Sequence, residues 1–245
     1  MIKEICEKFN FPASCKIDKK LYKKQLLENM SLKSDEKKAI KEDAESIELL
    51  YLLNSKNINI EPYTNDKVDY SEVAYIHLNL LSDKHYKKLA HILQQIPYMV
   101  VILISYEDKF CINLSTKRIN QNDKSKLIVD EEFTTTWIDI NKQSQKEQEF
   151  LKSLVLQNQS FVNFERFYND LVKKVVALKL SKDSQTLITP KETSKETLAK
   201  IYKLEEKIKE LKNSINKETH FNEKVNLNVE LKSLHDELDR IKDEI

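Results

Sequence analysis

The feature that most restricts the fold is an unbroken apolar run, MVVILIS, at residues 99–105. A strand that is apolar at every position is typical of a sheet covered on both faces. Before it, VAYIHLNLL (73–81) predicts a strand, and SDKHYKKLAHILQQI (82–96) predicts a helix that Ser82 caps and Pro97 ends. The central region is therefore expected to be a mixed sheet with helices, in an α+β chain.

Flanking segments predict further elements. FCINLST alternates like a half-exposed strand, and YEDK before it predicts a turn. Additional strands are predicted at 126–133 and 134–140, and an amphipathic helix at 161–180, after a polar stretch that begins at residue 141. Toward the N-terminus, the sequence predicts a basic helix at 19–30 and a longer helix at 34–54, which Ser34 and Asp35 open. The longer helix would carry a stripe of Ile40, Ala44, Ile47 and Tyr51.

Composition excludes several classes of protein. The chain has no glycine, so it contains neither a glycine-rich phosphate loop nor a glycine nucleophile elbow. Cys6, Cys15 and Cys111 lack paired ligand spacing, and no metal site, cofactor or disulfide framework is expected. The longest apolar run, at 96–104, is too short to cross a bilayer, and the first residues lack a signal sequence. A cytoplasmic protein without a membrane partner is predicted.

The C-terminal fifty residues carry heptad-like apolar spacing. One stripe ends at Ile215, and a second, two residues out of phase, begins at Leu227. Either a continuous helix changes its winding between them, or the chain folds back near residues 216–222 into a hairpin. We favour the continuous helix, because nothing in that segment compels a turn. The predicted organisation is an α/β domain at 1–180, a linker at 181–195 and a coiled-coil tail at 196–245.

The tail is expected to make the chain a homo-oligomer. The residues predicted to form the contact share the two heptad stripes or their extension: Ile201, Leu204, Ile208, Leu211, Ile215, Asn222, Val225, Leu231, Leu234, Leu238 and Ile241. Asn222, Asn226 and Asn228 lie beside the second stripe. Asparagines in such a stripe fix register and partner number at a cost in stability, while on a solvated face they do neither. Both interpretations stay open.

Catalytic chemistry has a weaker signal. Glu107 and Lys109 form the E-x-K spacing of metal-dependent nucleases, but they lie in a turn between apolar strands, where charged residues are ordinary. The second acid would have to come from Asp66, Asp69 or Glu72. Lys117, at the end of a predicted strand, is a more plausible positioned cation, although a lysine on an edge strand also prevents sheet association. No catalytic residue is therefore assigned.

Several stretches in the same order resemble a bacterial family catalogued as domain of unknown function 4391. They are FPASCKIDKKLYKK, SIELLYLLN, INI, VAYIHLNLL, IPYMVVILIS, STKR, TTTWIDI and KETHFNEKVNLNVELKSL. In the last of these, Glu218, Phe221, Asn222, Val225, Leu227 and Asn228 fit the family's pattern. The resemblance implies a setting beside helicase and DNA methyltransferase genes of restriction-like, anti-phage systems, and it implies no activity.

These observations favour a non-catalytic accessory subunit that docks helicase or DNA methyltransferase partners and self-associates through its tail. Two alternatives remain open. One is a divergent Mg²⁺-dependent nuclease using Glu72, Glu107 and Lys109 or Lys117. The other is a clamp subunit that contacts DNA through lysine-rich faces such as KIDKKLYKK (16–24). Acids that converge from separate segments would favour the nuclease, and a lysine stripe free of acids would favour the clamp.

Overall fold

The computed structural model describes residues 2–124, 126–181, 187, 195–218 and 220–243. The chain divides into two compact units, Met1–Ile188 and Thr189–Ile245. The predicted linker at 181–195 lies almost wholly outside the described residues. None of the described helices has the length and apolarity needed to span a bilayer.

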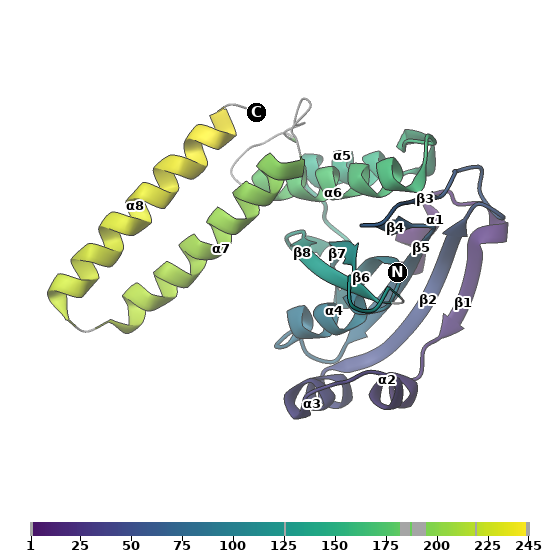
Figure 1. Cartoon of the computed structure of the whole chain (residues 1–245), viewed down its shortest axis with the longest axis horizontal. Coiled ribbons are helices and arrows are strands. Elements are labelled where there is room, and N and C mark those ends of the chain that lie inside the picture. Colours follow the sequence, from purple (N-terminus) through teal and green to yellow (C-terminus); the bar gives the residue numbers. More distant parts are fainter. Residues whose placement is uncertain (1, 125, 182–186, 188–194, 219, 244–245) are drawn as a thin grey trace. The chain divides into compact units, whose positions relative to one another are not determined.

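The first unit is built on a mixed seven-stranded sheet, which confirms the predicted α+β class (Figure 1). Its strands are β1 (Lys16–Lys20), β2 (Ala44–Asn54), β5 (Glu72–Leu80), β6 (Met99–Tyr106), β7 (Lys109–Ile119), β8 (Leu127–Thr134) and β9 (Ile138–Asp139). The order is β1-β2-β5-β6-β7-β8, and β9 pairs with β7. Only β5 and β6 are parallel, joined by the crossover helix α4 (Tyr86–Gln94). A separate small hairpin pairs β3 (Tyr63–Thr64) with β4 (Asp69–Tyr70).

Helices cover both faces of the sheet. They are α1 (Ile2–Glu7), α2 (Lys23–Asn29), α3 (Ser34–Glu42), α4, α5 (Gln145–Ser153) and α6 (Phe164–Leu180), with short 3-10 turns η1 (Ala13–Cys15) and η2 (Leu156–Asn158). One core contains Ile76, Ile102 and Cys111 with the buried side of α4. On the opposite face, Ile112 and Leu114 meet α6. The alternation of side chains along the strands separates these two cores.

Residues 44–54 correct the predicted long helix. Helix α3 ends at Glu42, and the chain continues as β2, which pairs with β1 on one side and β5 on the other. The apolar run in this segment fits a helix stripe as well as a buried strand, and pairing on both sides decides for the strand. Likewise, the predicted basic helix at 19–30 is part strand: β1 ends at Lys20 and α2 starts at Lys23.

Smaller boundaries also differ from the predictions. Helix α4 is capped at His85 rather than Ser82, and α5 forms within a stretch noted only as polar. Strand β7 is buried on both faces rather than half-exposed, because α4 and α6 both cover it. Of the predicted strand at 134–140, Thr134 is the last residue of β8, where it pairs with Asn113, and residues 138 and 139 pair with β7 as β9. The helix at 161–180 is present as α6.

The second unit consists of two helices, α7 (Lys195–Lys217) and α8 (Phe221–Asp243). The expectation of one continuous helix is wrong, because the helix ends at Lys217. Lys200 Nζ near the start of α7 lies 3.9 Å from Glu237 Oε1 near the end of α8, so the two helices run antiparallel as a hairpin (Figure 1).

Candidate functional site

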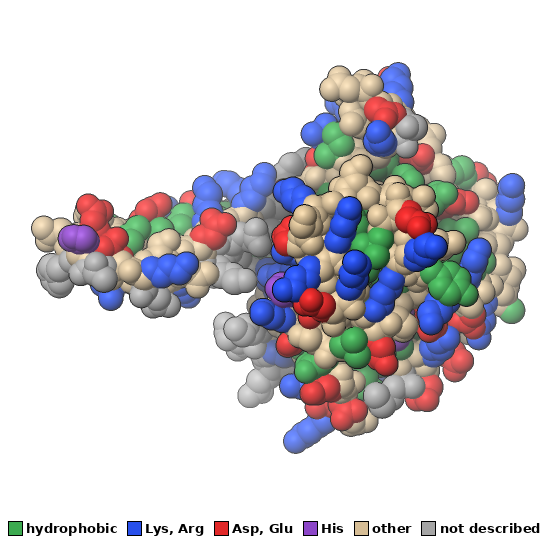
Figure 2. All heavy atoms as spheres, turned by 90° about the horizontal axis from the view of Figure 1, so that it is seen from below, with side chains coloured by type: hydrophobic (Ala, Val, Ile, Leu, Met, Phe, Trp, Pro, Cys, Tyr) green, Lys and Arg blue, Asp and Glu red, His purple; other side chains and the backbone are tan. Residues whose placement is uncertain are grey.

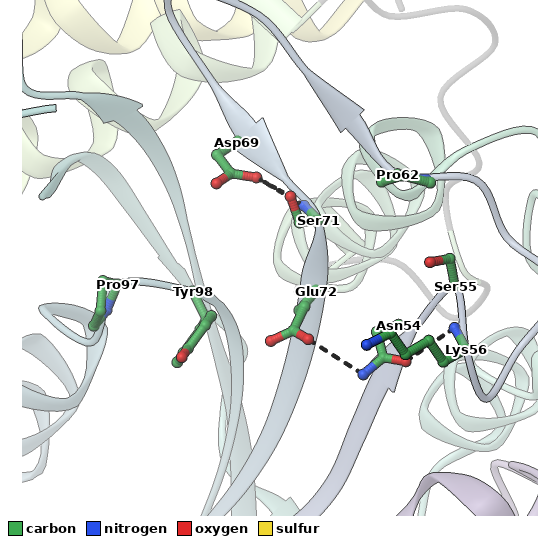
Figure 3. A pocket seen from close by; sticks show the side chains of 9 residues that line it. All are labelled: Asn54, Ser55, Lys56, Pro62, Asp69, Ser71, Glu72, Pro97 and Tyr98. Carbon is green, nitrogen blue, oxygen red and sulfur yellow. Dashed lines mark hydrogen bonds between the residues drawn. The ribbon is translucent and has the colours of Figure 1, made fainter. Parts of the chain in front are cut away.

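A pocket of about 280 Å³ opens at one end of the sheet (Figure 3). Asn54, which ends β2, pairs with Glu72, which begins β5, and Val73 pairs with Met99, the first residue of β6. The antiparallel and parallel pairings together bring the end of β2 and the starts of β5 and β6 to the same edge. The lining residues come from these strand ends and from neighbouring loops: Asn54, Ser55, Lys56, Pro62, Asp69, Ser71, Glu72, Pro97 and Tyr98.

The pocket is polar, and its acids are held in place. Asn54 Nδ2 donates to Glu72 Oε1 at 3.2 Å, and Asp69 Oδ1 accepts from the backbone N–H and the hydroxyl of Ser71. Figure 3 shows the second oxygen of Glu72 turned toward the side where Tyr98 lies. Two carboxylates against the single ammonium of Lys56 give the pocket an acidic balance. It suits a ligand group that donates hydrogen bonds.

Among the described residues, no group of three or more His, Cys, Asp or Glu side chains could hold a metal ion.

Lys117 lies behind the Tyr98 wall of the pocket. Its side chain is only 2% exposed, and its Nζ donates to the carbonyl oxygens of Ile96, at 2.9 Å, and Tyr98. Burial lowers the pKa of this ammonium from 10.5 to about 7, and the carboxylate of Glu132 opposes the shift. The side chain ties the segment after α4 to β7, so it positions one wall of the pocket.

Near Lys117, hydrogen bonds from buried side chains take the place of backbone pairing between β6 and β7. The recorded pairing of β6 with β7 starts at Ile102 and Asn113, so Val100 lies beyond it. The Tyr168 hydroxyl fills this gap: it donates to Val100 O at 2.8 Å and accepts from Ser115 N at 3.2 Å. From the other face, Gln94 Nε2 donates to Val100 O at 3.2 Å and to Asn113 Oδ1 at 2.8 Å. The start of β6 is therefore fixed by side chains from α4 and α6.

The residues of the nuclease alternative do not converge. Glu107 lies in the turn between β6 and β7, and Lys109 is the first residue of β7, at the far end of the sheet from Glu72. Seven paired positions of β5 and β6 separate the two ends, about 20 Å at roughly 3.3 Å per residue. Lys117 shares the end that holds Glu72, but its ammonium contacts backbone carbonyls.

The tail positions fall into three groups by exposure. Buried residues are Ile201, Leu204, Ile208, Ile215, Leu238 and Ile241. Leu211, Leu231 and Leu234 are partly buried. Asn222 and Val225 are exposed, as is Val229. Whether any of them forms an oligomer contact remains a prediction.

Sequence reasoning considered Asp69 and Glu72 but missed Asn54, Lys56 and Tyr98. These three lie at a strand end or in loops and match no motif. Pro62 and Pro97 mark the two loops, and they were the only local signal that the chain changes direction there.

The family model described as Domain of unknown function (DUF4391) matches residues 9–238, which spans both units. No curated protein and no solved structure matches the chain.

Proposed function

The chain belongs to the DUF4391 family of domains of unknown function, and on this basis we propose that it is a non-catalytic accessory subunit that acts by binding other proteins. The partners we propose are the helicase or DNA methyltransferase subunits of a restriction-like anti-phage system. This setting rests on the gene neighbourhood that the family resemblance implies. The helical hairpin would supply the contact, either with such a partner or with a second copy of the chain.

The observation that carries this proposal is a pair of apolar stripes on α8. The first stripe contains Leu231, Leu234, Leu238 and Ile241, which are partly or fully buried. The second contains Val225 and Val229, which are 43% and 66% exposed. At 3.6 residues per turn, the two valines lie on roughly the opposite side of α8 from the first stripe. Hence α8 has a second apolar face that the hairpin does not bury.

Exposed valines at this spacing have an energetic reason to be covered. Full burial of a valine side chain is worth about 1.5–3 kcal/mol. Asn222, which is also exposed, continues the same face one turn earlier. A face with apolar centres beside a polar position is typical of a helix that packs into a partner's groove.

The separation of Glu72 from Glu107 and Lys109 supports a non-catalytic role. A nuclease needs its carboxylates within reach of shared metal ions. We therefore expect the purified chain to leave DNA and RNA intact with Mg²⁺ or Mn²⁺. Cleavage that Glu107→Ala and Lys109→Ala abolish, but Lys84→Ala does not, would instead favour the nuclease.

The proposal is tested by co-purification of the chain with the helicase or DNA methyltransferase subunits that we propose as its partners. The test variant carries Val225→Asp and Val229→Asp, which place two charges on the outer face of α8. The matched control carries Asn213→Asp and Ser214→Asp, which add the same charge to exposed positions of α7. We expect the wild type and the control variant either to co-purify with the partner or to form a dimer or larger oligomer in light scattering. The valine variant should lose whichever of these two associations the wild type shows. Equal behaviour of both variants, or a monomer that captures neither protein, contradicts the proposal.

A further inference from the structure

A second surface of the first unit, separate from the pocket, combines basic and exposed apolar side chains. Residues 16–24 contain five lysines and one acid, and they form the edge strand β1 and the start of α2. Figure 2 views the molecule from the side on which α2 and α3 lie, and basic side chains gather on the face it shows. Neither the pocket nor the α8 face explains this concentration of charge.

The two lysines at the end of this strand, Lys19 and Lys20, are available to a ligand. Lys19 pairs with Leu49 and Lys20 with Glu48, so their side chains point to opposite faces of the edge strand. Nearby acids already have partners, because Lys3 Nζ lies 2.8 Å from Glu48 Oε2. Within the described part of the chain, Lys19 and Lys20 take part in no ion pair. Their charge is therefore not neutralised internally.

An exposed aromatic residue, Tyr22, follows these lysines two positions later in the chain. Tyr22 is 58% exposed, and Ile17 on the preceding strand is 41% exposed. The backbone of Tyr22 is fixed, because its carbonyl accepts from Gln25 N at 2.9 Å and from Leu26 N at 3.3 Å. An exposed ring on a fixed backbone beside free ammonium groups provides a stacking surface next to phosphate-binding charges.

The edge itself disfavours a peptide that would add as another strand. The pairing of β1 with β2 shifts between Lys16 and Lys19, and Asp18 has a positive φ of 48°. A bulge of this kind interrupts the regular row of backbone groups that strand addition requires. Lysine side chains and a stacking ring are not affected by the interruption. A ring can stack only on a base that is itself unstacked, which a single strand offers.

We propose that β1 and the start of α2 bind single-stranded nucleic acid, with Lys19 and Lys20 contacting phosphates and Tyr22 stacking on a base. The inference does not depend on the protein-binding role of the hairpin.

Fluorescence anisotropy of the full chain with a labelled oligothymidine of about 15 nucleotides tests the charge contribution. Binding is measured between about 50 and 200 mM salt. Each phosphate contact contributes about 0.7 to the magnitude of the negative slope of log K against log salt, so the double variant Lys19→Ala, Lys20→Ala should reduce this magnitude by about 1.4. The control, Lys142→Ala with Lys152→Ala, removes the same charge from exposed positions elsewhere and should leave the slope unchanged. An equal change in both variants means diffuse attraction and overturns the proposal.

Tyr22 variants test the stacking contribution separately. Tyr22→Ala should weaken binding roughly 5- to 150-fold, the range that loss of one stacked base spans, at an unchanged salt slope. Tyr22→Phe should retain wild-type affinity, because the ring remains. Binding that Tyr22→Ala leaves intact, tighter binding of the same sequence as a duplex, or equal competition by polyglutamate each overturns the assignment to a single strand.

Discussion

Replacing Lys117 by methionine should change how stability depends on pH. Methionine keeps an apolar chain of similar length but removes the buried ammonium. The lysine is 2% exposed, and burial lowers the pKa of its ammonium to about 7, from 10.5 in the unfolded chain. Between these two values the unfolded chain binds a proton at this position that the folded chain does not.

The sign and the size of the effect follow from this difference. Since the unfolded state binds more protons, the free energy of unfolding rises with pH, by up to about 1.4 kcal/mol per pH unit for one proton. The contribution is complete above 10.5 and is lost as the pH falls through 7. The full shift corresponds to about 5 kcal/mol, of which roughly 2–3 kcal/mol falls between about pH 7 and 9. Loss of the hydrogen bonds to Ile96 O and Tyr98 O adds a cost that does not vary with pH.

Urea denaturation between about pH 6 and 9.5 measures this directly. The quantity of interest is the unfolding free energy of the wild type minus that of Lys117→Met, because this difference cancels most other ionisations. It should rise from neutral to alkaline pH. Lys84→Met, which replaces an exposed lysine, should give a flat difference. A flat difference for Lys117→Met as well would refute the argument that burial neutralises this side chain.

Three further predictions concern other parts of the chain. Burial lowers the pKa of His77 to about 4 from 6.5. The free energy of unfolding of the wild type should therefore fall as the pH falls through this interval, by up to about 1.4 kcal/mol per pH unit, and that of His77→Gln should fall less when both are measured by urea denaturation. Ile208→Ala truncates a side chain that is 6% exposed and should destabilise the hairpin by about 2–4 kcal/mol in thermal melts followed by circular dichroism, whereas Lys207→Ala should not. Asn222→Leu changes an exposed position and should leave the hairpin's free energy of unfolding within about 0.5 kcal/mol of the wild-type value; a higher melting temperature with mixed oligomers would favour a register role.

The sequence predicted the centre of the sheet well because its signals there are local. The run at 99–105 has apolar residues that only a doubly covered strand can bury, and it is β6. Pro97 stops the preceding helix through its own covalent geometry, wherever the rest of the chain lies. The amphipathic stripe of α6 is likewise a property of consecutive residues, and this helix begins at Phe164 and ends at Leu180.

Residues 44–54 show where local signals fail. Ile47, Leu50 and Leu53 are spaced by three, which also fits a helix, and all three are buried in β2. What decides the conformation is pairing with β5, whose nearest paired residue lies about twenty positions away in the sequence. The pocket was unpredictable for the same reason. Asn54 and Glu72 meet only because β2 and β5 pair in one register, and Tyr98 joins them through the parallel pairing of β6.

The asparagines of α8 connect the sequence pattern to the proposed role of the tail. Asn222, Asn226 and Asn228 are exposed, and Asn228 Nδ2 donates to Lys224 O at 2.6 Å. The first apolar stripe of the tail lies on α7 and is buried inside the hairpin. Counted onward in the same heptad phase, its positions fall on Asn222, Val225 and Val229, which lie on the exposed side of α8. This is why the two stripes of the tail are out of phase. A helix with two continuous apolar faces would aggregate when its partner is absent. The three asparagines make the exposed side of α8 polar enough to face water when no partner is bound. The two valines on that side remain as apolar side chains that a partner can cover.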